Sequence, residues 1–107
     1  MRIPISVPSA RMAPGALSDL RKIRIYSKSA FGAAAARAYL LGLREVFGVI
    51  AGSPLIDIAE RDLGDGIRSY AYRSHRIYYQ LDPAGIVVVR ILHQARDVPR
   101  AMGEHRD

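Results

Sequence analysis

The 107-residue sequence contains no cysteine, so it can form neither a disulfide framework nor a thiolate nucleophile. Its longest apolar runs are far shorter than the roughly 20 residues that a membrane-spanning helix needs, and no long apolar core follows the N-terminus. Internal repeats, low-complexity tracts and linkers are also missing. We therefore expect a cytoplasmic protein that forms one domain over residues 1–107, with a single modest core.

The sequence is also poor in lysine. Lys22 and Lys28 are the only lysines among 16 basic residues, which face 10 acidic ones and give a formal net charge of +6. Guanidinium groups are planar forks that suit carboxylates and phosphates, so an arginine-rich domain favours an acidic partner such as nucleic acid or a nucleic-acid enzyme. Genome composition and solubility explain the same arginine content equally well, so charge alone does not decide the function.

Apolar spacing predicts two helices in the first half of the chain. The first begins at Pro14 or Gly15, and its apolar residues recur every three positions. They are Leu17, Leu20, Ile23 and Tyr26. A break over residues 27–32 precedes a second helix over residues 33–51, which a Gly-Ser-Pro sequence ends. Small residues on the second helix allow close approach, so the two helices are expected to form an antiparallel hairpin.

Three strands are predicted in the second half of the chain. They are residues 67–72, 76–81 and 86–92. The Asp82-Pro83-Ala84-Gly85 sequence is a strong hairpin turn, and the β-branched run over residues 86–89 favours a central strand. Residues 1–13 are expected to be extended, either as an N-terminal extension or with a first strand at 2–8 or 7–12. The predicted class is α+β with the order β-α-α-β-β-β, a helical hairpin packed on a small, mainly antiparallel sheet.

Short motifs follow one another over residues 16–102. The helices carry Ala16-x-x-Asp19-Leu20, Phe31-Gly32 and Ala36-x-x-Tyr39. The strands carry Gly66-x-Arg68, Ser74-His75-x-x-x-Tyr79 and Arg90-x-Leu92-His93-Gln94-x-x-Asp97. In this order the motifs resemble the ParE-type toxins of the RelE/ParE superfamily of bacterial toxin–antitoxin proteins.

The resemblance implies the toxin of a type II toxin–antitoxin system, with a role in plasmid stabilisation. It implies a protein that inhibits DNA gyrase, uses no cofactor or metal, and forms a hetero-oligomer with a ParD-like antitoxin. RelE-type members of the superfamily are instead ribosome-dependent mRNA endoribonucleases, and they use lysines on the second strand and an aromatic hydroxyl near the C-terminus. Residues 67–72 contain no lysine, and Met102 stands at the C-terminal position. The resemblance therefore favours a non-enzymatic gyrase inhibitor, with an endoribonuclease and an inactive antitoxin-binding relative as alternatives.

Basic residues on the predicted strands, and just after them, are the candidates for target binding. They are Arg68, Arg76, Arg90, His93 and Arg96. Side chains two apart on a strand share a face, so the arginines are expected to form one positive patch. In the endoribonuclease alternative, Arg76 and Arg96 bind phosphate and His93 acts as acid or base. His75 is interpreted as a structural residue at a turn, and Asp19 and Asp97 as residues that begin helices.

The antitoxin is expected to bind beside the helical hairpin. The candidate residues are Leu40, Leu41, Phe47 and Arg73. The resemblance implies an antitoxin segment that folds on the toxin, with apolar anchors in a groove and acidic residues on exposed arginines. The alternative is that the three apolar residues belong to the core of the domain.

Overall fold

The computed structural model describes residues 9–56, 58–59, 64 and 66–94. Its elements are β1 (Ser9–Met12), α1 (Pro14–Phe31), α2 (Ala33–Gly52), β2 (Ile58–Ala59), β3 (Arg68–Tyr72), β4 (His75–Asp82) and β5 (Gly85–His93). The strands form one sheet in the order β1-β5-β4-β3-β2, in which β1 runs parallel to β5 and the other neighbours are antiparallel. The predicted α+β class is confirmed, and the two-residue strand β2 is the one described element that was not predicted.

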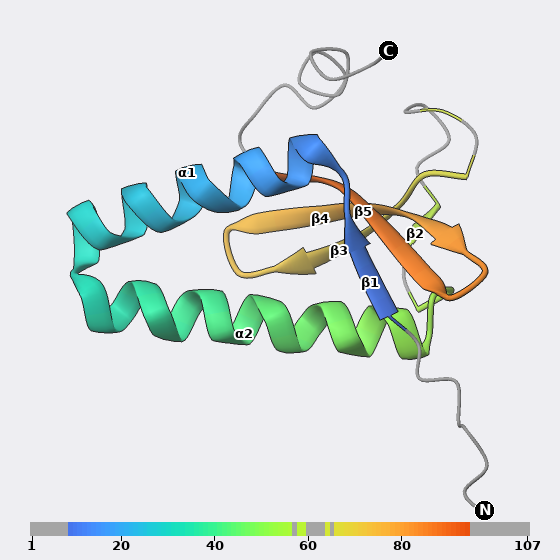
Figure 1. The fold of residues 1–107 in the computed structure, drawn as a ribbon, viewed down its shortest axis with the longest axis horizontal. Helices are drawn as coiled ribbons and strands as arrows, with labels where there is room; N and C mark the ends of the chain where they lie inside the picture. The colour runs from blue at the N-terminus through green and yellow to red at the C-terminus, as the bar shows by residue number, and fades with distance from the viewer. Residues whose placement is uncertain (1–8, 57, 60–63, 65, 95–107) are drawn as a thin grey trace, which may run out of the picture.

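The helices form a hairpin whose closed end projects beyond the sheet (Figure 1). The main core lies between this hairpin and the sheet. It includes Ile23, Leu43, Phe47, Ile50, Ile77, Tyr79, Ile86, Val88 and Ile91. A smaller cluster of Ile67, Tyr78 and Leu92 forms a second apolar group. Within the described ranges, neither helix is long and apolar enough to cross a membrane.

The break between the helices is shorter than predicted. Helix α1 continues to Phe31, and Gly32 alone separates it from α2. Gly32 has φ +93°, a conformation that glycine adopts far more readily than other residues. Its N–H still donates to the Lys28 carbonyl at 3.0 Å, as expected at the end of a helix.

The buried face of α1 also differs from the prediction. Ala16, Ile23 and Ser27 are buried, whereas Leu17 and Tyr26 are exposed. Small side chains let α1 approach the sheet closely, so the larger apolar residues lie beside the contact rather than within it. Apolar spacing identified the helix correctly, but it identified its buried face only in part.

Strand β1 confirms the later of the two positions predicted for a first strand. It pairs Ser9 with Gly85 and Met12 with Val88, and residues 1–8 lie outside the described part of the chain. Gly85 begins β5 with φ +151°, and a Cβ atom there would collide with the Ser9 backbone. The predicted turn before it is confirmed, with the Ala84 N–H donating to Asp82 Oδ2 at 3.1 Å. Gly85 therefore allows the parallel strand to dock.

A buried ion pair fastens α1 to β5. Past Val88, β5 has no β1 partner, and a register shift opposite Tyr78 and Tyr79 marks a bulge at residue 89 of β5. At this open edge of β5, the Asp19 carboxylate accepts three hydrogen bonds. Arg90 Nε donates to Oδ2 at 2.7 Å and Arg90 Nη2 donates to Oδ1 at 3.0 Å, while the Ile91 N–H donates to Oδ2 at 2.8 Å. The interpretation of Asp19 as a helix-start residue is wrong, because α1 begins at Pro14 and the carboxylate lies inside the fold.

Breaking this pair is predicted to destabilise the protein strongly. Arg90→Gln leaves a buried carboxylate without its cation, which costs about 3–5 kcal/mol of unfolding free energy. The matched control is Arg11→Gln, because Arg11 forms its ion pair with Asp82 at the surface and its side chain is 65% exposed. Urea unfolding followed by circular dichroism should show a large loss for the first variant and a much smaller one for the control.

A double variant separates the charge effect from a packing effect. Asp19→Leu combined with Arg90→Met removes both charges, so it should recover part of the stability that Arg90→Gln loses. Equal losses in Arg90→Gln and Arg11→Gln would contradict the role given to the buried pair.

Candidate functional site

The arginines predicted to form one positive patch lie on different sides of the sheet. Arg68 pairs across the strands with Tyr79, whose ring belongs to the helix-side core, and Arg68 Nη2 donates to the Leu55 carbonyl at 3.5 Å. Arg76 stands opposite Leu92 on the other face and donates from Nε to Ser69 Oγ at 2.9 Å. Residues directly opposite each other on paired strands share a face, so these two arginines point away from each other.

Arg90 is not a surface residue. It is 1% exposed and bound to Asp19, so the expectation that it contributes to a target-binding surface is wrong. Arg90 stands opposite Tyr78, on the face of Arg76, but the Asp19 carboxylate binds its guanidinium inside the fold. Arg96 and Asp97 lie outside the described residues.

His93 lies on the face opposite to Arg76. It pairs across the strands with His75, and the two ring centroids are 5.5 Å apart with the rings nearly perpendicular. His75 is half-buried, whereas His93 is exposed. The endoribonuclease alternative placed Arg76 and His93 around one phosphate, but the sheet separates their side chains.

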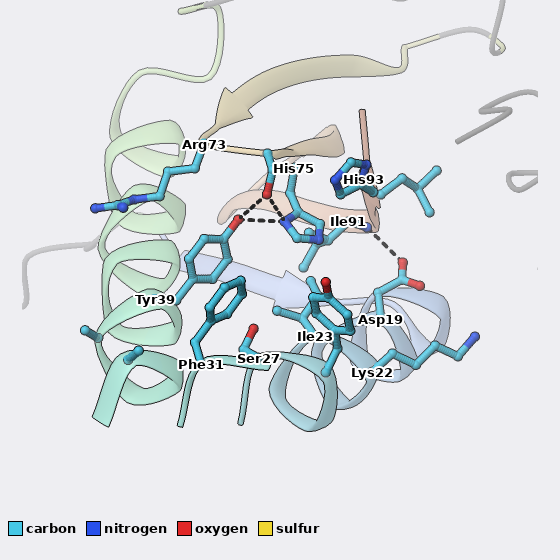
Figure 2. A pocket seen from close by; sticks show the side chains of 15 residues that line it. Asp19, Lys22, Ile23, Ser27, Phe31, Tyr39, Arg73, His75, Ile91 and His93 are labelled. Carbon is cyan, nitrogen blue, oxygen red and sulfur yellow. Dashed lines mark hydrogen bonds between the residues drawn. The ribbon is translucent and has the colours of Figure 1, made fainter. Parts of the chain in front are cut away.

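The two histidines line a cavity of about 780 Å³ between the closed half of the helical hairpin and the sheet. Figure 2 shows the imidazoles on the strands and the Phe31 and Tyr39 rings across from them, with Lys22 on α1. We call this the histidine pocket. Its lining residues are Asp19, Lys22, Ile23, Tyr26, Ser27, Phe31, Ala35, Ala38, Tyr39, Arg73, Ser74, His75, Ile91, Leu92 and His93.

Tyr39 fixes the orientation of His75. Its hydroxyl lies 2.6 Å from His75 Nδ1 and 3.4 Å from Ser74 Oγ. Burial lowers the pKa of His75, the nearby His93 lowers it further, and Asp19 acts in the opposite direction. A neutral imidazole accepts at one ring nitrogen and donates at the other, so the tautomer of His75 sets the direction of this hydrogen bond: in the tautomer that carries its proton on Nε2, the Tyr39 hydroxyl donates to Nδ1.

A tight turn presents His75 to the pocket. Strands β3 and β4 are joined by Arg73 and Ser74, and Arg73 has φ +52°. Gln94 secures the turn, because its side-chain amide donates to the Arg73 carbonyl at 2.8 Å and its backbone N–H donates to the Ser74 carbonyl at 3.0 Å. The end of β5 therefore holds the turn from which the His75 side chain emerges.

A second hollow, of about 1040 Å³, lies between α1, α2 and β1. Three of the four predicted antitoxin-binding residues, Leu40, Leu41 and Phe47, line it, although Phe47 is largely buried. Basic residues surround this apolar floor. They are Arg21, Arg24, Lys28, Arg37 and Arg44. None of the described residues that line it is acidic, and we call it the basic groove.

Arg73 does not belong to the basic groove. It lines the histidine pocket, and its guanidinium carbon lies 6.0 and 5.8 Å from the ring centroids of Tyr39 and Tyr72. The four predicted antitoxin contacts are thus divided between two surfaces.

Comparisons with known proteins agree with this fold. The family model described as the ParE toxin of the parDE type II toxin–antitoxin system matches residues 10–98. The chain belongs to this family. Among solved structures, the chromosomal ParDE toxin–antitoxin system from P. aeruginosa matches with a TM-score of 0.69 and 14% identity, covering 83% of this chain and 98% of that chain. The RelBE2 toxin–antitoxin complex from Mycobacterium tuberculosis matches with a TM-score of 0.59 and 22% identity, covering 87% of this chain and 98% of that chain. A search of curated protein sequences gave no match.

Sequence reasoning on this ParE-family toxin missed most of the histidine pocket. The sequence predicts His75 as a turn residue and Tyr39 as a residue of the helix face. Their contact joins positions 36 residues apart, which no local pattern reveals. The one available signal was the pair Ser74-His75 beside a strand, since a histidine and a hydroxyl at a strand end often belong to a polar site.

The pocket of this ParE-family toxin should make its stability depend on pH. Because the folded protein binds a proton at His75 less readily than the unfolded chain does, the contribution is fully present above the unfolded pKa of about 6.5 and is lost as pH falls through the folded pKa. Urea unfolding from about pH 7.5 to about pH 5 should show a steeper loss for the natural sequence than for His75→Gln. Parallel pH profiles would contradict this.

Proposed function

We propose that this ParE-family toxin inhibits DNA gyrase and is neutralised by a ParD-like antitoxin in a hetero-oligomer. The family match over residues 10–98 supports the toxin role. The two similar structures are a ParDE system and a RelBE2 toxin–antitoxin complex, which supports an antitoxin partner. A gyrase target also implies that the chain acts in the cytoplasm.

The observation that carries the choice of gyrase over RNA cleavage is the separation of Arg76 from His93. Cleaving RNA requires a base for the 2′-hydroxyl, an acid for the leaving oxygen and a cation on the phosphate between them. Arg76 and His93 stand on opposite faces of the sheet, and β3 contains no lysine. This arrangement favours a toxin that acts by binding.

The basic groove supports an acidic, amphipathic partner segment. Its floor offers the exposed Leu41 and the half-buried Leu40, and its rim carries cations from both helices. A segment of the antitoxin with apolar residues on one side and carboxylates on the other would match both features. We propose that the antitoxin binds here, and that the groove rather than Arg73 supplies its main contacts.

Two assays on the purified chain test the target. In a supercoiling assay with purified gyrase, the toxin should inhibit the enzyme, and addition of the antitoxin should restore activity. In a ribosome-coupled translation assay, the message should stay intact. Cleaved message with active gyrase would establish the endoribonuclease alternative, and no effect in either assay would indicate an inactive antitoxin-binding relative.

Leu41→Asp should weaken antitoxin binding about 10- to 100-fold, because it removes an apolar anchor and places a carboxylate where the partner brings its own. The matched control is Val49→Asp, which introduces the same charge on the same helix. The two residues are 51% and 50% exposed, but Val49 does not line the basic groove. Isothermal titration should show a loss for Leu41→Asp only. Equal losses would place the antitoxin elsewhere.

A further inference from the structure

The histidine pocket is separate from the basic groove and has different chemistry. Its rim and inner end offer hydrogen-bond donors: Lys22, Ser74, His75, His93 and Arg73. Among the described residues that line it, Asp19 is the one carboxylate, and it already accepts from the buried Arg90 and the Ile91 N–H, so its charge is matched inside the fold. A cavity that has many hydrogen-bond donors, and whose carboxylate is already paired with an arginine, favours an anionic ligand.

The walls of the pocket add a second property. The Tyr39 ring is half-buried, while Phe31 is 68% exposed and makes an edge-on contact with Tyr26, with ring centroids 6.3 Å apart. Exposed aromatic faces are unfavourable in water and stack readily on planar rings. Figure 2 shows the Phe31 and Tyr39 rings across from the two imidazoles. The pocket therefore places planar apolar surfaces and anion-binding donors within one cavity.

We propose that the histidine pocket binds a nucleotide, with the base against the Phe31 and Tyr39 rings and the phosphate on Lys22 and His75. The cavity volume of about 780 Å³ lies in the range that accommodates small-molecule ligands. In the tautomer in which the Tyr39 hydroxyl donates to Nδ1, His75 offers its Nε2–H as a donor to the phosphate, and Lys22 supplies the full positive charge. The same chemistry suits a free mononucleotide or one nucleotide of a single-stranded chain. The proposal holds whether or not the toxin acts on gyrase.

The two lysines of the sequence provide a matched test. Lys22 lines the histidine pocket and Lys28 lines the basic groove, although both lie on α1. Titration calorimetry on the full chain would use adenosine 5′-monophosphate, adenosine, inorganic phosphate and short single-stranded oligonucleotides. Lys22→Gln should weaken binding of the monophosphate about tenfold, the loss expected for one charge-assisted hydrogen bond, while Lys28→Gln should leave it unchanged.

Further variants test the two parts of the ligand. His75→Gln should weaken the monophosphate and inorganic phosphate alike, and Phe31→Ala should weaken the monophosphate but not inorganic phosphate. If the oligonucleotide binds more tightly than the monophosphate, the natural ligand is a nucleic-acid chain. If the monophosphate binds more tightly, the natural ligand is a free nucleotide. Circular dichroism confirms that each variant is folded.

Several results would overturn the proposal. They are no saturable binding of any nucleotide at millimolar concentration, equal losses in Lys22→Gln and Lys28→Gln, and equal affinity for adenosine and its monophosphate. Loss of antitoxin affinity in Lys22→Gln without nucleotide binding would also overturn it, and would assign the pocket to the antitoxin. Because gyrase inhibition is measured separately, its failure and the failure of this proposal are distinguishable.

Discussion

The position of the helical hairpin over the sheet depends on one buried carboxylate. Asp19 accepts three hydrogen bonds from β5 at the place where β1 ends and a bulge interrupts the pairing with β4. Without this acceptor, the Ile91 N–H and the Nε–H of Arg90 would lose their hydrogen bonds to Asp19 inside the fold. A buried polar group that loses its partner costs a large share of the stability of a small domain. Apolar residues of similar volume in place of Asp19 and Arg90 could pack equally well. The ion pair is therefore best understood as fixing the place on β5 at which α1 docks.

The elements of this fold could be predicted because each depends on local chemistry. Proline at the start of α1, Gly32 between the helices and the Asp82 turn all act within a few residues of their position. The burial of Arg90 could not be predicted in this way. A surface position is the ordinary expectation for arginine, and the partner that holds Arg90 inside the fold, Asp19, lies 71 positions away on α1. The predicted positive patch failed because Arg90 is buried and because Arg68 and Arg76 stand on opposite faces of the sheet.

The candidate sites show the same limit. Leu40 and Leu41 are predicted as antitoxin contacts from the family resemblance, and the structure places both in the lining of the basic groove. The histidine pocket draws on α1, α2, the turn between β3 and β4, and the strands β4 and β5. Its central contact joins Tyr39 to His75 across 36 positions. Only the packing of the hairpin on the sheet brings those residues together, so the pocket could not be derived without the structure.

One turn of α2 serves both surfaces, because Tyr39 faces the histidine pocket while Leu40 and Leu41 line the basic groove. A movement of this turn would alter both. The structure holds it in place: the Tyr72 hydroxyl donates to the Tyr39 carbonyl at 2.9 Å, and a side chain at position 42 would collide with that hydroxyl. Gly42 thus lets β3 fasten the helix at the point where the surfaces meet. Because this hydrogen bond and the close approach at Gly42 hold the shared turn against β3, the turn is not expected to transmit a change from one surface to the other.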